Sequence, residues 1–369
     1  MSAAGVIRVA VVGVGHLGRH HARILGAMPG VQLVGILDLN GERAREVASA
    51  CGTAVLTDLA QLPGTVDAVT IAVPTESHLA VALPLIESGV PVLVEKPLAR
   101  SVAEADRLLE AARTRGVMVA VGHTERFNPA LVAARPHLGV PRFVEVHRLG
   151  TFPERSLDID VVFDLMIHDL DVILSIVDSP MVALDAVGVP VLTARIDIAN
   201  VRLRFASGCI ANLTASRISR DRVRKIRLFQ TDSYISVDYA AQDLEVWRLV
   251  RPPTGAPSIE GGKQAVASEE PLKRELADFV DALRTGRAPG VTGDDGRRAL
   301  AAAEQITEQM TMAGEPVRCR PAGPECSEHE HSGIGRHRSE SRRGSRVDRH
   351  GCGGACLHVR HRVARDGSR

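Results

Sequence analysis

The sequence predicts an α/β protein with an N-terminal doubly wound parallel sheet and a C-terminal α/β domain with a large, mostly antiparallel open sheet. Up to residue 122, short and continuously apolar segments alternate with helical patterns, which is typical of parallel strands covered on both faces. After Gly122, successive apolar segments are joined by short loops, as in an antiparallel sheet. We therefore predict one domain in residues 1–122 and a second in residues 123–317.

The first domain contains six predicted strands rich in Val and Ile. Their ranges are Ile7–Val12, Gln32–Leu37, Ala54–Leu56, Ala68–Val73, Val92–Val94 and Met118–Val121. The helices between them have recognisable ends, since Ser101 and Glu104 have the spacing of a capping box and Gly52 and Gly116 suit helix C-termini. A series of this βαβ kind indicates a doubly wound sheet.

The second domain begins with a linking segment and a helix in residues 123–137. Seven strands are predicted after it, near Arg142–Arg148, Val182–Val191, Asp197–Phe205, Cys209–Ser216, Lys225–Gln230, Tyr234–Asp238 and Asp243–Val250. The helices are expected at Phe163–Val177, Leu272–Thr285 and Asp294–Met312, and the Pro- and Gly-rich segment Arg251–Gly262 is expected to be a loop.

Beyond Cys319 the composition changes abruptly. The segment from Arg320 to the C-terminus contains 11 arginines, no lysine and six acidic residues, with almost no aliphatic periodicity. Such a segment cannot bury enough apolar surface to become ordered. We therefore expect residues 318–369 to be a disordered basic tail.

Charge and cysteine content exclude several classes of function. The formal net charge is +1, with the arginines concentrated in the tail, which argues against a nucleic-acid partner. No apolar run reaches the ~18 residues that cross a bilayer, and the N-terminus lacks the features of a signal peptide. The body contains only Cys51 and Cys209, so we expect no disulfide framework and a cytoplasmic location.

The motif Gly13-Val14-Gly15-His16-Leu17-Gly18 follows the first strand and opens a helix. Its glycines suit a tight turn at Gly13, close approach of a pyrophosphate at Gly15, and helix–strand packing at Gly18. Asp38, 20 residues after Gly18, would bind the ribose 2′-hydroxyl and disfavour a 2′-phosphate. The motif predicts a Rossmann domain that binds NAD rather than NADP, although Arg43 lies close by; the alternative is a glycine-rich turn with a capping Asp38.

A second motif, Val94-Glu95-Lys96-Pro97, lies at the carboxyl end of the fifth predicted strand, where ligands of such sheets bind. Lys96 there could hold a substrate oxygen and stabilise an alkoxide, and its pKa could fall beside an oxidised nicotinamide. The alternative is a solvated lysine at a strand end.

In the predicted helix Phe163–Val177, Asp164, His168 and Asp171 share one face. Polar groups on one stripe of an apolar helix need partners or a cavity, and histidine is suited to proton transfer near neutral pH. Alternatives are a hydrogen-bonded core histidine or a zinc site. The zinc site is disfavoured because no thiolate ligands accompany it, so we predict no metal.

The segment Glu125-Arg126-Phe127-Asn128-Pro129 lies just past the sixth strand. Arg126 and Asn128 could reach the substrate from the domain junction. Asn128 and Pro129 also have the pattern of a helix N-cap and first helical residue, and the two roles are compatible.

Together, these motifs and their order resemble the Gfo/Idh/MocA oxidoreductase family over residues 5 to 317. The resemblance implies Lys96, Asp164 and His168 as catalytic residues, a cis bond between Lys96 and Pro97, and a homodimer or homotetramer formed through the open sheet. We predict cofactor contacts at the positions His16, Leu17, Val73, Pro74, Thr75, His78, Glu95 and Lys96, beside Gly13, Gly15, Gly18 and Asp38. Predicted substrate contacts are Lys96, Arg126, Asn128, Asp164 and His168.

Within that family, segments such as Asp197–Asn200, Ala211–Arg217 and Arg224–Arg227 are similar to the UDP-N-acetylglucosamine 3-dehydrogenases. This resemblance implies oxidation of a sugar 3-hydroxyl to a ketone for lipid A synthesis, followed by a partner aminotransferase. A basic cluster would suit the diphosphate, or form a solvated sheet edge; its members are Arg217, Arg220, Arg222, Arg224 and Lys225. The alternatives are an inositol or other polyol dehydrogenase and a non-catalytic NAD-binding regulator.

The predicted reaction places the sugar between the nicotinamide and the helix Phe163–Val177. His168, oriented by Asp164, takes the hydroxyl proton, and Lys96 holds the oxygen. Which of Lys96 and His168 is the base stays open at this point.

Overall fold

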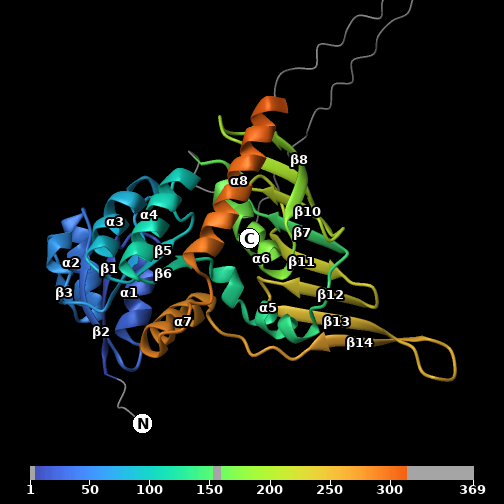
Figure 1. Ribbon diagram of the computed structural model, residues 1–369, viewed down its shortest axis with the longest axis horizontal. Coiled ribbons are helices and arrows are strands. Elements are labelled where there is room, and N and C mark those ends of the chain that lie inside the picture. The colour runs from blue at the N-terminus through green and yellow to red at the C-terminus, as the bar shows by residue number, and fades with distance from the viewer. Residues whose placement is uncertain (1–4, 153–158, 314–369) are drawn as a thin grey trace, which may run out of the picture. The chain divides into compact units, whose positions relative to one another are not determined.

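The computed structural model describes residues 5–152 and 159–313 and contains two sheets of different topology (Figure 1). The first sheet has six parallel strands in the order β3-β2-β1-β4-β5-β6. The second has eight strands in the order β14-β13-β12-β11-β7-β10-β9-β8, all antiparallel except the pair β7 and β10. The predicted fold class is thus confirmed, while the predicted tail 318–369 lies outside the described residues.

The first sheet alternates strands and helices along the chain. Its strands are β1 (Ile7–Val12), β2 (Val31–Leu37), β3 (Ala54–Val55), β4 (Ala68–Ile71), β5 (Val92–Glu95) and β6 (Val119–Gly122). Its helices are α1 (Gly18–Gly26), α2 (Gly41–Cys51), α3 (His78–Glu87) and α4 (Val102–Arg115). Successive strands are added on one side of β1 up to β3 and on its other side from β4 to β6, so the strand order switches between β1 and β4. Parallel α/β sheets bind ligands at such a switch point.

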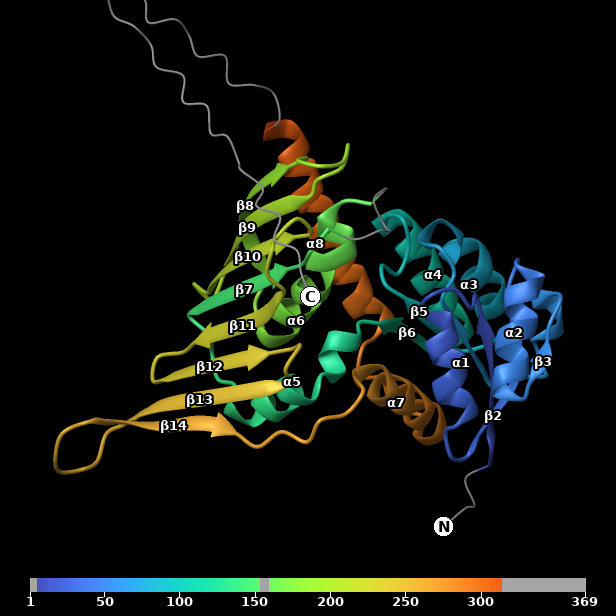
Figure 2. The ribbon, with the colours of Figure 1, turned by 180° about the vertical axis from the view of Figure 1, so that it is seen from behind.

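Both faces of this sheet are buried because alternate residues of each strand face opposite helices. Val9 and Val11 pack with α1 and α2, whereas Ala10 and Val12 pack with α3 and α4. Two C-terminal helices also cover the sheet. Helix α7 (Pro271–Thr285) packs on the same face as α1 and α2, and Leu300 of α8 (Gly293–Ala313) packs on the same face as α3 and α4. Figure 2 shows α7 beside α1, far apart though they are in the sequence.

The helix-end signals in the sequence are largely confirmed. Gly52 and Gly116 adopt left-handed conformations, with φ of 64° each, directly after α2 and α4. The Ser101 hydroxyl accepts a hydrogen bond from the backbone N–H of Glu104. The reciprocal half of the capping box is absent, because the Glu104 carboxylate accepts from Arg100 instead.

The second sheet is built around β7 (Phe143–Leu149), which pairs with strands that follow it much later. The other strands are β8 (Met181–Val189), β9 (Ile198–Phe205), β10 (Ile210–Ser216), β11 (Val223–Phe229), β12 (Ser233–Asp238), β13 (Asp243–Val250) and β14 (Ser258–Gln264). Its core contains residues of α5 (Pro129–Ala134), α6 (Ile167–Ile176) and α8. Alternate residues of β9 and β10 are buried, so these helices cover one face of the sheet.

One prediction about the second domain is wrong, and another differs from the structure in the form of a helical turn. The segment Arg251–Gly262 was expected to be a loop, but the chain from Ser258 onwards forms β14 at the sheet edge. Gly261 and Gly262 suggested a turn, whereas Gly261 permits close pairing with β13, since a Cβ there would lie 2.0 Å from the Val246 oxygen.

The second difference concerns the helix predicted at Phe163–Val177. The chain forms a π-helical turn over Val162–Met166 before α6 begins at Ile167. The wider turn alters the angular spacing of Asp164 relative to the residues of α6, so an α-helical wheel misplaces it. Such turns are frequent at functional sites.

Within the described ranges, no helix combines the length and the apolar character that crossing a membrane requires. We propose residues 1–122 and 123–317 as the two domains, because each contains one of the sheets.

We expect Gly18→Ala to lower the free energy of unfolding by about 1–3 kcal/mol, because a Cβ at Gly18 would lie 1.8 Å from the Gly13 carbonyl oxygen. Gly15→Ala is the matched control, since a Cβ there has no neighbour within 4 Å. Urea denaturation of both variants measures the difference. Equal stability of the two would contradict the packing role assigned to Gly18.

Candidate active site

The turn between β1 and α1 is shaped by close backbone packing. Gly13 has a φ of 83°, and a Cβ there would lie 2.8 Å from backbone atoms of Ala72. Gly15, by contrast, faces open space, so its backbone is accessible. The turn therefore combines two glycines required by packing with one that leaves room for a ligand.

The N-terminus of α1 suits an anion. No side chain caps it and its first turn contains no acidic residue, so the positive end of the helix is not neutralised locally. Of the other predicted cofactor contacts, His16, Leu17 and Pro74 are exposed, and Val73 and Thr75 are partly exposed. These residues lie at the carboxyl ends of β1 and β4.

Asp38 lies at the end of β2 and anchors the same turn. Its carboxylate accepts hydrogen bonds from the backbone N–H of Val14, at 2.7 Å, and from the guanidinium of Arg43, at 2.7 Å. Burial alone would raise the pKa of Asp38, but the hydrogen bonds from Arg43, Val14 and Asn40 lower it below its ordinary value. The carboxylate is thus ionised at neutral pH, and the half-exposed Arg43 is its partner.

Lys96 follows β5, and its peptide bond to Pro97 is cis, as expected. Its Nζ donates a hydrogen bond to the backbone oxygen of Asp164 at 2.7 Å and lies 3.7 Å from the Asp164 carboxylate. Burial lowers the pKa of Lys96, while the negative charges of Asp164 and Glu95 oppose that shift. A lysine held in this way can donate to a substrate oxygen and can release a proton more readily than a solvated one.

The structure brings Lys96, Asp164 and His168 together. Burial and the positive charges of Lys96 and Arg148 keep the pKa of His168 well below its ordinary value, so the imidazole is neutral and able to accept a proton. The prediction that Asp164 orients His168 is wrong, because Asp164 contacts Lys96 and no hydrogen bond joins it to His168 among the described residues. The displaced geometry follows from the π-helical turn that contains Asp164.

His123 is a neighbour of this group that the sequence analysis missed. It follows β6, its ring lies 6.0 Å from the His168 ring at nearly a right angle, and it is fully buried. Neither of its ring nitrogens has a hydrogen-bond partner within the described part of the chain. Its place at the carboxyl end of a parallel strand, like that of Lys96, was a signal that could have identified it.

Two buried arginines hold α6 in place. Arg148 of β7 forms a two-pronged ion pair with Asp169 and also contacts Glu125. Arg126 forms a similar pair with Asp171, at 2.7 and 3.1 Å. These pairs fix the helix next to the predicted site from both sides.

Arg126 and Asn128, which were predicted to contact the substrate, are both held by contacts within the chain. The Arg126 guanidinium is engaged by Asp171 rather than free for a ligand. The Asn128 side chain caps α5, as its alternative role predicted, and its amide donates to the backbone oxygen of Tyr239. Both residues stabilise the region around the site, and their contact with a substrate stays a prediction.

Two predicted cofactor contacts, His78 and Glu95, are also buried. The ring nitrogens of His78 lie 2.9 Å from the Pro97 oxygen and 3.0 Å from the Val73 oxygen. His78 thus links the loops that follow β4 and β5. Glu95 contacts His21 of α1 at 2.9 Å.

The predicted basic cluster divides into two groups. Arg217 is buried in an ion pair with Asp197, and Lys225 is paired with Asp238. Arg220, Arg222 and Arg224 are exposed. Arg224 lies near enough to His168 for its charge to contribute to the lowered pKa of that histidine.

Comparison with protein families identifies both parts of the chain. Residues 7–123 match the model of the oxidoreductase family with an NAD-binding Rossmann fold, Gfo/Idh/MocA. Residues 133–236 match the Gfo/Idh/MocA C-terminal domain.

Two curated relatives illustrate the range of the similarity. A UDP-N-acetylglucosamine 3-dehydrogenase from Acidithiobacillus ferrooxidans is 40% identical over 302 residues, which is 81% of this chain and 96% of the relative. Inositol 2-dehydrogenase 1 from Saccharopolyspora erythraea is 30% identical over 331 residues, covering 81% and 92% of the two chains.

Solved structures show the same similarity. The Acidithiobacillus ferrooxidans UDP-N-acetylglucosamine 3-dehydrogenase has a TM-score of 0.78 at 39% identity, covering 83% of this chain and 98% of that one. A levoglucosan dehydrogenase in complex with NADH and levoglucosan has a TM-score of 0.76 at 20% identity, covering 83% and 97%, which supports the fold alone.

We expect buried His123 to make the fold sensitive to acid. Burial lowers its pKa from 6.5, so below about pH 6.5 the unfolded chain takes up a proton that the folded protein does not, and the free energy of unfolding falls. His123→Leu should therefore lose less stability than the wild type between pH 7.5 and 5.5, by up to about 1.4 kcal/mol per pH unit. Urea denaturation at several pH values measures this.

The control for that experiment is His147→Gln, which changes a partly exposed histidine of β7. Parallel pH dependences of the His123 variant and the wild type would refute the assignment.

Proposed function

The chain belongs to the Gfo/Idh/MocA family of oxidoreductases, and we propose that it oxidises the 3-hydroxyl of UDP-N-acetylglucosamine to a ketone, with NAD as the acceptor. It is a dehydrogenase acting on a CH–OH group, as its named sugar and polyol relatives are. The observation that carries the proposal is the contact of Lys96 with the Asp164 segment, beside a neutral His168.

The residues around the first turn fit a dinucleotide. The accessible Gly15 backbone and the uncapped N-terminus of α1 would hold the pyrophosphate, and Asp38 would lie at the adenosine ribose. Bound oxidised NAD supplies the acceptor for a hydride. The chain's own residues supply orientation, charge and a path for the hydroxyl proton.

Lys96 and His168 have complementary tasks in this proposal. The Lys96 ammonium group donates a hydrogen bond to the sugar oxygen and stabilises the negative charge that develops as its proton leaves. His168, kept neutral by burial and by the charges of Lys96 and Arg148, has an unprotonated ring nitrogen that accepts that proton. Asp164 holds the Lys96 side chain in position through its backbone oxygen and its carboxylate.

We propose NAD rather than NADP because the ionised Asp38 would repel a 2′-phosphate. Arg43 does not reverse this preference, because its guanidinium is paired with that same carboxylate. The acceptor can be tested directly by supplying either dinucleotide in the assays below.

The nucleotide-sugar assignment is supported by charge as well as by similarity. Exposed Arg220, Arg222 and Arg224 precede or begin β11, and the charge of Arg224 acts on His168. Guanidinium groups suit the paired phosphates of a nucleoside diphosphate. An uncharged polyol offers no use for them.

We also propose that the protein forms a homodimer or homotetramer in the cytoplasm and acts before an aminotransferase in lipid A synthesis. Exposed apolar side chains on the second sheet, such as Val182, Val187 and Trp247, support assembly through that sheet. The ketone product would be the aminotransferase's substrate. The mass of the protein in solution tests the assembly.

Lys96→Met should lower kcat by about 10³-fold while NAD still binds. The variant lacks the ammonium group that donates to the sugar oxygen but retains the glycine turn that would hold NAD. Steady-state absorbance of reduced nicotinamide and a separate NAD titration measure the two effects. Activity close to that of the wild type would reject the assignment of Lys96.

UDP-N-acetylglucosamine should be turned over with a kcat/KM at least about 10²-fold above that of myo-inositol or free N-acetylglucosamine.

Arg224→Ala should raise KM for the nucleotide sugar by about tenfold, because it removes a partner of the diphosphate. Arg107→Ala, an exposed arginine of α4, is the control. A preference for inositol would favour a polyol dehydrogenase, and tight NAD binding without any turnover would favour a regulator.

A further inference from the structure

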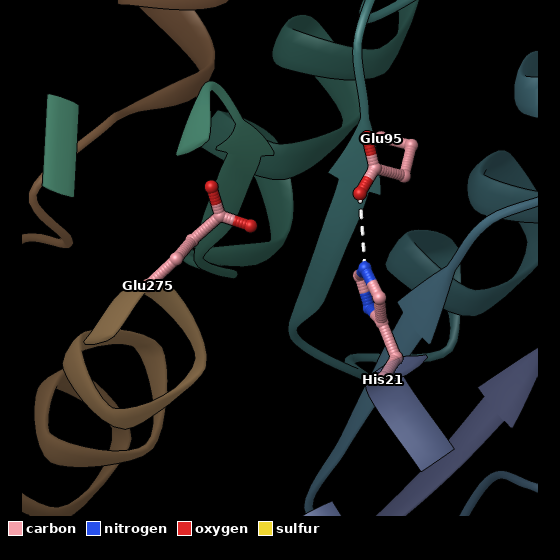
Figure 3. A group of neighbouring side chains, drawn as sticks. All are labelled: His21, Glu95 and Glu275. Atoms are coloured by element: carbon pink, nitrogen blue, oxygen red, sulfur yellow. Dashed lines mark hydrogen bonds and ion pairs between the residues drawn. The ribbon is translucent and has the colours of Figure 1, made fainter. Parts of the chain in front are cut away.

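Three buried side chains from different parts of the chain come together at the end of β5, next to Lys96 in the sequence. His21 comes from α1, Glu95 from the end of β5, and Glu275 from α7, and none is more than 5% exposed (Figure 3). One nitrogen or oxygen atom of each side chain lies within 4.8 Å of the corresponding atoms of the other two. No step of the proposed reaction uses these groups directly.

Glu95 is held on both of its carboxylate oxygens. His21 Nε2 lies 2.9 Å from one oxygen, and the backbone N–H of Lys96 donates to the other at 3.2 Å. Because an ionised carboxylate only accepts hydrogen bonds, His21 must carry its proton on Nε2. The paired residue on β6 is Gly122, where a Cβ would lie 3.0 Å from the Glu95 carboxylate, so a glycine makes room for it.

Glu275 differs from Glu95 in its surroundings. It is 2% exposed, and its oxygens have no hydrogen-bond partner within 3.5 Å in the described part of the chain. Burial and the negative charge of Glu95 raise its pKa well above the ordinary value, although the Thr124 hydroxyl opposes that shift. The hydrogen bond from His21 and the charges of His21 and Lys96 instead hold the pKa of Glu95 low, although burial alone would raise it.

The geometry argues for a proton rather than a metal ion between these groups. Two ligands of a zinc ion with bonds of about 2.0–2.2 Å lie more than 3 Å apart in a tetrahedral site. The 2.9 Å contact between His21 and Glu95 is a direct hydrogen bond, which leaves no space for an ion between them.

We propose that His21, Glu95 and Glu275 form a positioning unit for Lys96, in which Glu95 carries the single negative charge and Glu275 is a neutral carboxylic acid. Glu95 fixes the backbone of Lys96 and places an anion beside its ammonium group. His21 of α1, the helix at the cofactor turn, contacts this anion directly. Glu275 of α7 is the third member and lies within 4.8 Å of the other two. The inference rests on the role proposed above for Lys96.

Each member of the unit faces other charged groups, which also influence it. Those around Lys96 are Asp164, Glu95 and Arg148; those around Glu95 are His21 and Lys96; and those around Glu275 are Glu95, Asp171 and Asp278. Of these groups, Glu95 alone influences both Lys96 and Glu275. Removal of its charge should therefore lower the pKa of Lys96, which the charge of Asp164 continues to raise.

The test is a lysine NMR titration, which is practical because the chain contains four lysines: Lys96, Lys225, Lys263 and Lys273. With ¹³C-labelled lysine, the Lys96 signal is the one that Lys96→Met removes. Glu95→Gln should lower the Lys96 titration midpoint by at least about one pH unit, because an adjacent anion is lost. Glu275→Gln should leave it unchanged, because a neutral amide replaces a neutral acid.

Two results of this titration would overturn the proposal. One is an unchanged Lys96 midpoint in Glu95→Gln, and the other is an equal downward shift in Glu275→Gln, which would mean that Glu275 is also ionised. Thermal melting shows whether each variant is folded.

Infrared difference spectroscopy gives a second test that does not depend on the Glu95 variant. At pH 7 the C=O stretching band of a carboxylic acid should be present in the wild type and absent in Glu275→Gln. The control variant Glu110→Gln changes a glutamate whose side chain is 74% exposed, and it should leave the band in place. Absence of the band from the wild type, or a stoichiometric metal ion that is lost in Glu275→Gln, would overturn the proposal.

Neither measurement requires turnover. An active Lys96→Met variant would reject the proposed function while leaving the titration and the infrared band interpretable. A normal Lys96 requirement with no effect of Glu95→Gln on the titration would reject the positioning unit alone.

Discussion

The hydrogen bond from the Lys96 ammonium group to the Asp164 backbone oxygen is the contact on which the candidate site depends. It joins the end of a strand in the first sheet to the π-helical turn that precedes α6, which packs on the second sheet. A lysine at a strand end is common. The contact of its Nζ with a helical turn that packs on the other sheet forms only when the whole chain is folded. The ion pairs of Arg126 and Arg148 with α6 therefore serve the site by keeping that helix where Lys96 can reach it.

The region around Lys96 is unusual for the number of ionisable groups it buries. Burial of an unpaired charge raises the free energy of the folded state, and the chain avoids this in two ways. Arg126 and Arg148 remain charged because carboxylates face them. His123 and His168 are neutral because burial and nearby cations lower their pKa values, so they add no uncompensated charge.

Much of the fold was predictable because its signals are local. The glycine turn, the apolar strands and the caps at Gly52, Gly116 and Asn128 depend on neighbours in sequence. Lys96 and His168 were also identifiable, the first from its position at a strand end and the second as a polar residue in an apolar helix. The partners were not predictable: Arg126 with Asp171 and His21 with Glu95 pair across 45 and 74 residues. The π-helical turn left no periodic signal, and β14 was hidden by glycines that usually mark loops.

The packing of α7 and α8 has a consequence for how the protein is made. Leu276 and Phe279 complete one face of the first sheet, and Val291 and Leu300 complete the other, although all six strands of that sheet end by Gly122. A ribosome therefore releases the strands long before the residues that finish their cover. The order of synthesis runs against the order of packing, and the nascent N-terminal sheet retains uncovered apolar surface until the last helix has emerged.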